Sequence, residues 1–371
     1  MEKYRRIIGS FLFLLVAPAI HAGDGPTLGG RLFIDGGWYA GAPKGFHSGV
    51  AITDVRLTGK YRWNDGWYAK MDISFARNQI RLKDVFIEKT IGRHIFRTGY
   101  MLGFFSLDQS SSSNDFLFLT ASNCAETFYF GRRLGASYTL NLPTYYASAG
   151  VFCGDGVWTD QKTEQGYNAS VRFVFRPYHD IGKLFHIGSG AVFRVPDRHE
   201  EATSRLITLK SKANTSLSAP SLFALPVDHV RRQWQWNIET FAQDGAFFVQ
   251  AEYMKVWIER YPHPAFCGQG AYVEGGWVVK GSVLGYNPVD ALPVCASGPK
   301  ALILFGRFNY TDLNDRVFRG GRLHDLSVGA NYYLNRNLIF RFNYSHQWAD
   351  AQSTVGKTNW GLFQSRIQFR F

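Results

Sequence analysis

The sequence predicts an all-β fold, a transmembrane antiparallel β-barrel of about 16 strands. Three observations lead to this prediction. Apolar and polar residues alternate along most of the chain, which places them on opposite faces of strands. After the N-terminal segment there is no run of about 18 apolar residues, the length that a membrane-spanning helix requires. Aromatic residues form 16% of the 371-residue chain, and a barrel places them on its outer band and at both membrane interfaces. A secreted β-sandwich or lectin is the alternative.

The N-terminal segment, residues 1–22, has the layout of a secretory signal peptide. Three basic residues precede an apolar run over residues 7–19, and small residues follow. The run is too short to span a bilayer comfortably. We expect cleavage after Ala22, although the small residues at 17–19 compete, and a buried or anchoring helix is the alternative. Cleavage there leaves one barrel domain, residues 23–371, and export predicts the outer membrane of a bacterial cell.

Alternation defines the individual strands. In the stretch WYAKMDIS, Met71 and Ile73 alternate with Lys70 and Asp72. At the end of the chain, NWGLFQSRIQFRF places mostly apolar residues on one face and arginines and glutamines on the other, and we expect this strand to close the barrel against the first one. An even number of strands also returns both termini to one side. The predicted strands start near these residues: Leu28, Gly49, Gly66, Ile80, His94, Arg132, Thr144, Tyr167, Leu184, Arg231, Ala246, Ala271, Ala301, Arg322, Leu338 and Asn359.

The connections between the strands alternate between short turns and longer loops, as in outer-membrane barrels. Two loops, Phe104 to Gly131 and Asp197 to Val230, far exceed the usual connection of about 4 to 6 residues. They could lie on top of the barrel, cover its mouth or fold into its lumen. The connection from Gly281 to Lys300 is also long, although it falls on the side of the short turns. This indicates a plug or an error in the strand count.

Several stretches, taken in order, resemble a known family. They include LGGRLFIDGGWY, VRLTGKYRWNDGWYAKMDISF, LKDVFIEK, GFFSLDQSSSSNDFLFLT, GRRLGASY, AYVEGGWVVKG and LFGRFNYTDLND. Together they resemble the phosphate-selective porins O and P, outer-membrane anion channels. The resemblance implies a 16-stranded barrel, usually a homotrimer, whose long loops fold into the lumen and form an anion-binding constriction lined by Arg and Lys.

One stretch departs from the family. Its members typically carry a basic residue just after the serines of the constriction loop, where this chain has Asn114 or Asp115. No Lys or Arg occurs between Phe104 and Gly131, whereas Asp108 is present. We therefore take Asp108, Asn114 and Asp115 as constriction-loop candidates. A porin is expected, but phosphate specificity does not follow.

Strand parity identifies basic residues that are expected to line the pore and attract anions. A surplus of positive charge there favours anions collectively, although for any single arginine an ordinary salt bridge in the barrel interior is the alternative. The predicted pore-lining residues are Arg56, Lys60, Lys70, Arg133, Arg172, Arg307, Arg341 and Arg366.

Four cysteines are present, and export to an oxidising compartment favours disulfides. Cys124 lies in the first long loop and Cys153 near the outer end of a strand, so we predict a bridge between them. Cys267 and Cys295 could pair only if the segment from Gly281 to Lys300 folds into the lumen. Neither a CxxC motif nor paired histidines indicate a metal site.

The predicted function is passive diffusion of small hydrophilic solutes with a preference for anions, possible substrates including phosphate and other oxyanions. No cofactor is expected. An enzyme is not expected, because Ser345 and His346 are strand neighbours that point to opposite faces. The alternatives are a structural or adhesin-type barrel without conductance and, less favoured, a barrel hydrolase.

The expected partners are outer-membrane lipid, other copies of the chain and the barrel-assembly machinery, through Phe371. Nucleic acid is not expected, because the net charge of +12 is dispersed.

Overall fold

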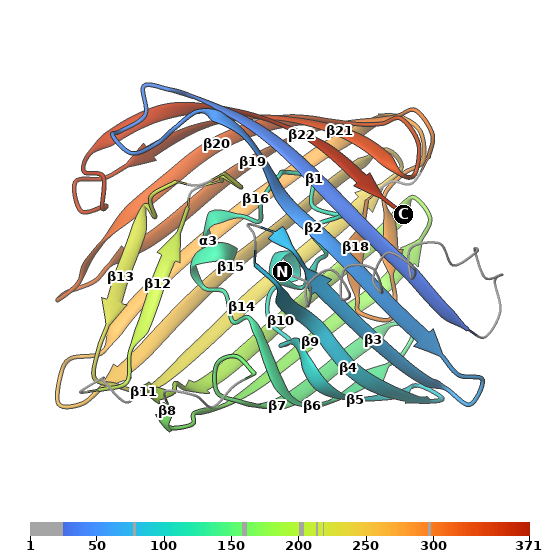
Figure 1. Cartoon of the computed structure of the whole chain (residues 1–371), viewed down its shortest axis with the longest axis horizontal. Helices are drawn as coiled ribbons and strands as arrows, with labels where there is room; N and C mark the ends of the chain where they lie inside the picture. The colour runs from blue at the N-terminus through green and yellow to red at the C-terminus, as the bar shows by residue number, and fades with distance from the viewer. Residues whose placement is uncertain are drawn as a thin grey trace, which may run out of the picture.

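The computed structural model describes residues 25–371 except 77–78, 158–161, 200–203, 213, 218 and 296–297. The predicted signal peptide lies outside the described residues. Within them, the chain forms a closed antiparallel β-barrel of 16 strands, as predicted (Figure 1). The barrel strands, in order around the wall, are β1 (Pro26–Ala40), β2 (Gly49–Arg62), β3 (Trp67–Ser74), β4 (Arg81–Ile91), β5 (His94–Leu102), β6 (Arg132–Asn141), β7 (Tyr145–Cys153), β9 (Tyr167–Asp180), β10 (Lys183–Val195), β14 (Val230–Asp244), β15 (Phe247–Arg260), β16 (Phe266–Lys280), β19 (Ala301–Asn314), β20 (Arg319–Tyr333), β21 (Leu338–Ala349) and β22 (Thr358–Arg370).

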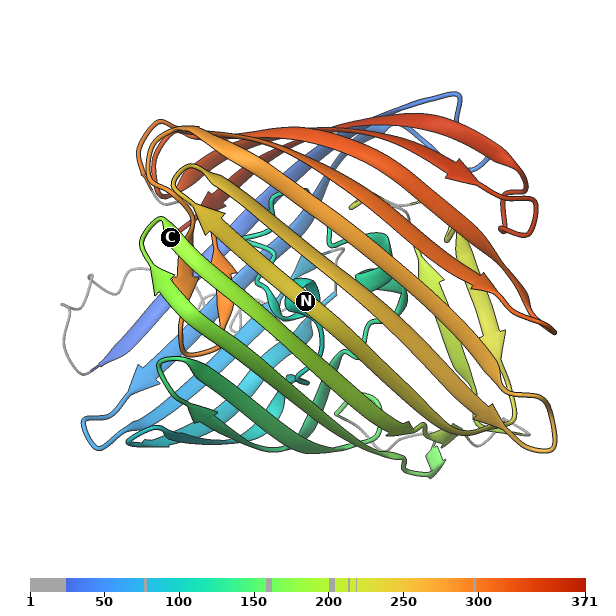
Figure 2. The same cartoon turned by 180° about the vertical axis from the view of Figure 1, so that it is seen from behind.

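The last strand closes the barrel against the first, as expected. Strands β1 and β22 pair in antiparallel register from Arg31 opposite Arg370 to Ala40 opposite Gly361. Every strand edge in the wall is therefore paired, which leaves no edge free for association with another chain. Figure 2 shows that the strands are tilted steeply with respect to the barrel axis, the geometry that closure requires.

Alternation along each strand separates the two faces of the wall. In β22, Phe363 and Ile367 are 44% and 46% exposed on the outer face, whereas Gln364 and Arg366 are 1% and 3% exposed inside. On other strands, too, aromatic residues such as Trp236 and Phe342 are exposed on the outer face. This is the arrangement of a lipid-facing band.

The two ends of the barrel differ. The end that holds both termini of the wall has tight turns, and we call it the turn end. Gly182 and Gly245 have φ values of 78° and 55° in two of these turns, a conformation that glycine adopts without steric cost. The opposite end carries the longer connections, and we call it the loop end. No helix in the described part of the chain is both long and apolar enough to span a membrane.

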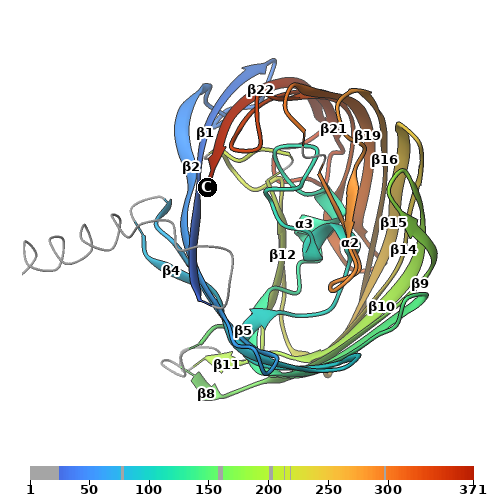
Figure 3. The same cartoon turned by 90° about the vertical axis from the view of Figure 1, so that its right-hand side faces the viewer.

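Three segments fold into the barrel. Residues 103–131, which we call the constriction loop, carry α2 (Leu107–Ser110) and α3 (Asn123–Thr127), and both helices lie inside the ring of strands in Figure 3. The mouth hairpin consists of β12 (Ile207–Ser211) and β13 (Phe223–Val227). The turn-side hairpin consists of β17 (Gly285–Asn287) and β18 (Leu292–Val294). A short pair, β8 (Lys162–Glu164) and β11 (Arg198–His199), lies at the loop end.

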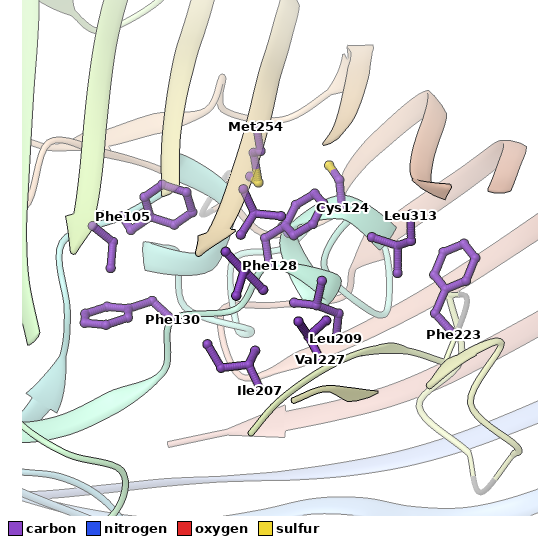
Figure 4. Packing of buried hydrophobic residues seen from close by; sticks show 14 of the residues in the cluster. Phe105, Cys124, Phe128, Phe130, Ile207, Leu209, Phe223, Val227, Met254 and Leu313 are labelled. Atoms are coloured by element: carbon purple, nitrogen blue, oxygen red, sulfur yellow. The ribbon is translucent and has the colours of Figure 1, made fainter. Parts of the chain in front are cut away.

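The inserted segments pack on the inner wall through an apolar core. Phe128 of the constriction loop and Leu209 of the mouth hairpin share a buried cluster with Met254 and Leu313 of the wall (Figure 4). A second cluster joins the constriction loop, the turn-side hairpin and the wall, through Leu117, Leu284 and Ile303 among others. The inserted segments are therefore packed parts of the structure.

Candidate pore and its lining

Most of the predicted pore-lining cations face the barrel interior but do not line an open passage. Five of them are only 0–3% exposed. The prediction that they attract solutes is therefore corrected, because inserted segments and wall carboxylates cover them. These five residues are Arg133, Arg172, Arg307, Arg341 and Arg366.

Two of these arginines bind the constriction loop. Arg307 donates to the Thr120 carbonyl oxygen at 3.2 Å, and its guanidinium lies 4.2 Å from the centre of the Phe118 ring. Arg341 donates to the Asn114 carbonyl oxygen at 2.6 Å and also to that of Phe116. These residues hold the loop to β19 and β21.

Two more arginines neutralise buried carboxylates. Arg172 lies 2.7 Å from Glu239 and donates to the carbonyl oxygens of Asp290 and Ala291 in the turn-side hairpin, at 3.0 and 2.9 Å. Arg366 pairs with Asp35 at 2.6 Å. The turn-side hairpin, which lies in the long connection after β16, is thus a partial plug that is bound to the wall, and the strand count was correct.

Arg133 belongs to a charged cluster at the loop end. Asp155, in the connection after β7, forms ion pairs with Arg133 and with Arg194, the latter at 2.5 Å. Burial alone would raise the pKa of the Asp155 carboxyl, but Arg194 and Arg133 outweigh burial and lower this pKa to about 2. Arg133 also donates to the Phe130 carbonyl oxygen at 2.9 Å, and so it anchors the end of the constriction loop.

The wall from β2 to β4 remains accessible to solvent and carries the other three predicted cations. The side chains of Arg56 and Lys70 are 17% and 23% exposed, and Lys60 is exposed. By contrast, the inward-facing Asn237, on β14, is fully buried. Water therefore reaches the side of the lumen opposite the inserted segments.

The parity of the strands did not identify two further cations, Lys83 on this wall and Arg132, which reaches it from β6. The pairing of β3 with β4 has a register shift at Lys83. Two residues of β4, Lys83 and Asp84, lie opposite the single residue Asp72 of β3. Such a bulge changes the direction in which a side chain points, and the alternation of inward and outward residues in the sequence does not reveal the bulge. Arg132, the first residue of β6, donates to Asp84 at 2.7 Å.

Carboxylates interrupt this row of positive charge. Arg56 pairs with Asp54 at 3.2 Å and with Asp72 at 3.3 Å, and Lys70 pairs with Asp84 at 2.7 Å. Neither Lys60 nor Lys83 forms an ion pair within the described part of the chain. The five cations of this cationic wall are Arg56, Lys60, Lys70, Lys83 and Arg132.

Comparison with known proteins agrees with this architecture. Residues 28–371 match the family described as phosphate-selective porin O and P. The chain belongs to this family. An uncharacterized protein of Caulobacter vibrioides is 24% identical to this porin over 336 residues, which are 85% of this chain and 67% of the relative.

Solved outer-membrane proteins share the fold of this porin. The trimer form of OmpT from Vibrio cholerae aligns with a TM-score of 0.61 at 10% identity, over 94% of this chain and 100% of that one. The anion-selective porin from Comamonas acidovorans aligns with a TM-score of 0.58 at 12% identity, over 94% and 100%. Family and fold together are those of a porin channel of the bacterial outer membrane.

The constriction-loop candidates of this porin are divided by the structure. Asp108 is 5% exposed, accepts from the Ser122 N–H at 2.6 Å and thus stabilises the loop internally. Asn114 offers its carbonyl oxygen to Arg341. The Asp115 carboxylate lies 3.8 Å from Arg370, and burial raises its pKa despite the nearby Arg370 and Arg341. The tip of the loop is thus serine-rich and acidic.

The cysteines of this porin are all free, so the predicted Cys124–Cys153 bridge is not formed. The physical reason is their placement. Cys124 packs on β16, where a Cβ atom added to Gly270 would lie 2.4 Å from the Cys124 Cβ. Cys153 ends β7, and four strands separate β7 from β16 along the shorter way around the wall. Cys295 does fold into the lumen, where its thiol donates to the Asp115 carbonyl oxygen at 2.8 Å.

The residues considered for other chemistry do not converge. Ser345 is 1% exposed on the inner face, whereas the ring of the neighbouring His346 lies beside Trp348 on the outer face, with ring centres 4.5 Å apart. Within the described residues, no group of three or more His, Cys, Asp or Glu side chains is arranged to hold a metal ion.

Proposed function

We propose that this porin conducts small solutes passively and prefers anions. The observation that carries the proposal is the cationic wall, where five basic side chains face three carboxylates, Asp54, Asp72 and Asp84. A passage lined by a surplus of one charge raises the local concentration of the opposite ion. The unpaired Lys60 and Lys83 leave that surplus uncompensated.

Strong retention of phosphate is not part of the proposal. An oxyanion is held by several charge-assisted hydrogen bonds, most effectively from arginine. The tip of the constriction loop offers serines and Asp115 instead, and Arg31, a wall arginine that contacts this tip, already donates to Ser113 at 2.6 Å and to Asp54 at 2.5 Å. The wall therefore attracts anions that the loop does not retain.

The deciding experiment is a planar-bilayer recording of the purified porin in asymmetric potassium chloride. We expect a reversal potential on the anion side and little block by millimolar phosphate. Cation selectivity would contradict the anion preference, and block by micromolar phosphate would contradict the weak phosphate site. A barrel without conductance would support a structural role instead. Incubation of the same preparation with lipid and peptide substrates tests the barrel-hydrolase alternative, and we expect no turnover.

We further propose that the porin forms a homotrimer with its turn end toward the periplasm and its loop end outside the cell. The described trimer form of a protein of the same fold supports the first part. The alternation of short turns and long loops supports the second. An epitope inserted after His263, in the connection between β15 and β16, should be accessible on intact cells, whereas one at Asn335 should not.

The C-terminal residue is our proposed contact with the barrel-assembly machinery. Phe371 exchanges backbone hydrogen bonds of 3.1 Å with Gly30, and its side chain remains 55% exposed beside Phe369. Its replacement by Ser should reduce the yield of assembled barrel in cells more than the stability of barrel refolded in detergent.

We also propose that residues 1–22 are cleaved off during export. N-terminal sequencing of the mature protein can check this cleavage.

A further inference from the structure

One carboxylate of the barrel wall binds the start of the constriction loop. Glu252, in β15, accepts from the Ser106 hydroxyl at 3.0 Å, the Leu107 N–H at 2.8 Å and the Asp108 N–H at 3.0 Å. Glu252 is only 3% exposed, so these donors replace water around its carboxyl oxygens. Two wall side chains complete its shell: Asn237 at 2.9 Å and Tyr272 at 3.0 Å.

The backbone at this point needs such support. Ser106 has a φ of 68°, a region that residues with a side chain rarely adopt and that costs on the order of 1–3 kcal/mol. The conformation persists only where the surrounding contacts determine it. Glu252 supplies these contacts, because it binds the Ser106 hydroxyl and the two following N–H groups.

One guanidinium on a different part of the wall binds the tip of the same loop. Arg341, in β21, is fully buried and donates to the carbonyl oxygens of Asn114 and Phe116. Gln368 of β22 donates to the Asn114 carbonyl at 3.3 Å. Within the described residues Arg341 has no carboxylate partner, so the loop carbonyls are the main acceptors for its charge.

We propose that Glu252 and Arg341 are positioning residues that set the constriction of the pore through the loop, without touching the solute. The carboxylate binds the N–H groups at the start of the loop, and the guanidinium binds the C=O groups at its tip. Each group matches only one polarity of the backbone. Strands β16, β19 and β20 separate β15 from β21, so the loop is fixed at two distant points. This inference rests on the proposed porin function.

Conservative substitutions separate positioning from simple electrostatic attraction. Arg341→Lys keeps the charge but replaces a planar fork by a single ammonium, which binds two carbonyl groups less well. Glu252→Gln keeps the size but directs an NH2 donor at N–H groups. If Arg341 only attracted anions, Arg341→Lys would leave the conductance and the selectivity unchanged.

Single-channel recording of the full-length porin tests the proposal. We expect both variants to replace one conductance level by several and to change the mean conductance by about twofold, since the narrowest part of a pore dominates its resistance. Ser345→Ala is the control, because Ser345 is buried on the same strand as Arg341 but bonds to Ser327 at 2.7 Å and to no constriction-loop residue that the structure describes. The control should keep the wild-type level.

A second measurement makes the result independent of conductance. Folded barrel is identified by its heat-dependent mobility in SDS gels, and chymotrypsin then probes the loop at Phe116 and Phe118. We expect faster cleavage in both variants than in the wild type. If Arg341→Lys changes neither the conductance nor the rate of cleavage, the proposal is overturned. This test by Arg341→Lys holds even if Glu252→Gln fails to fold. Absence of conductance in the wild type would contradict the porin function instead, and cleavage would still report on the loop.

Discussion

Arg366 binds Asp35 through two hydrogen bonds, from Nε at 2.6 Å and from Nη2 at 2.7 Å, and so joins the last barrel strand to the first. Both side chains are almost completely buried, 3% and 0% exposed. Asp35→Asn should leave the guanidinium without its counter-charge. We expect a loss of about 3 kcal/mol in the free energy of unfolding, the order found when one partner of a buried pair is removed. Urea unfolding in detergent measures it.

The matched control is Asp65→Asn in the β2–β3 turn. Asp65 pairs with Lys89 at 3.4 Å, but its side chain is 62% exposed. An exposed pair contributes about 0–1 kcal/mol. Equal effects of Asp35→Asn and Asp65→Asn would show that the buried pair does not stabilise closure.

Removal of the two unpaired lysines of the cationic wall should weaken the anion preference. Loss of a charge near the path of an ion changes its energy by about 1 kcal/mol at ~4 Å in water. For Lys60→Ala combined with Lys83→Ala we therefore expect a roughly two- to fivefold fall in the ratio of chloride to potassium permeability. Reversal potentials in asymmetric potassium chloride give this ratio.

Arg133→Ala is the control for that experiment. Arg133 has the same parity as the other lumen-facing cations but is bound to Asp155 and to the Phe130 carbonyl, away from the open wall. Its removal should alter stability more than selectivity. A larger selectivity change for Arg133→Ala than for the lysine pair would refute the placement of the open passage.

The acidic loop tip should make the porin sensitive to pH. Burial raises the pKa of the Asp115 carboxyl above the ordinary value of 3.8. Ionisation of Asp115 at neutral pH therefore costs folding free energy, and this cost disappears as the pH falls through its folded-state pKa. Asp115→Asn should be more stable than the wild type at pH 7, with a difference that shrinks toward pH 4. Thermal unfolding across this range checks the sign.

Removal of the same charge should also favour anions. We expect a higher ratio of anion to cation permeability for Asp115→Asn at pH 7, and convergence with the wild type on acidification. A constant difference between the two proteins across this pH range would mean that Asp115 is not the titrating group.

The cysteines should be found as free thiols, two of them poorly reactive. Burial raises the pKa of Cys124 well above its usual range and that of Cys295 to about 11. Because the thiolate is the reactive form, iodoacetamide should label Cys124 and Cys295 only after unfolding. Cys153 and Cys267, which are half-buried, should react earlier. Recovery of a Cys124–Cys153 peptide under non-reducing conditions would contradict the structure.

The barrel itself could be predicted from the sequence because its wall obeys one simple rule. Inside and outside alternate at every residue, so strand number and the faces of β22 follow from the pattern. The rule fails at a register shift, which is why Lys83 was missed. It also cannot say what covers an inward-facing side chain, so Arg341 was assigned to the pore although the constriction loop buries it.

A signal for the inserted segments was nevertheless present in the sequence. Near the loop end of β15, the inward-facing residues change from the polar Glu252 to the apolar Met254, Val256 and Ile258. A water-filled lumen gives no reason for such residues. An apolar inner face predicts that a loop packs on it, but only the folded chain identifies which loop does so.

The apolar inner wall has a consequence for attempts to widen this pore. Deletion of the constriction loop or the mouth hairpin would expose Met254, Val256, Ile258 and Leu313 to water inside the channel. A hydrophobic passage of this kind excludes water and ions by dewetting. A wider pore built from this barrel therefore requires that the apolar residues of the inner wall are replaced by polar ones at the same time. In evolution, the length of an inserted loop and the polarity of the wall beneath it must change together.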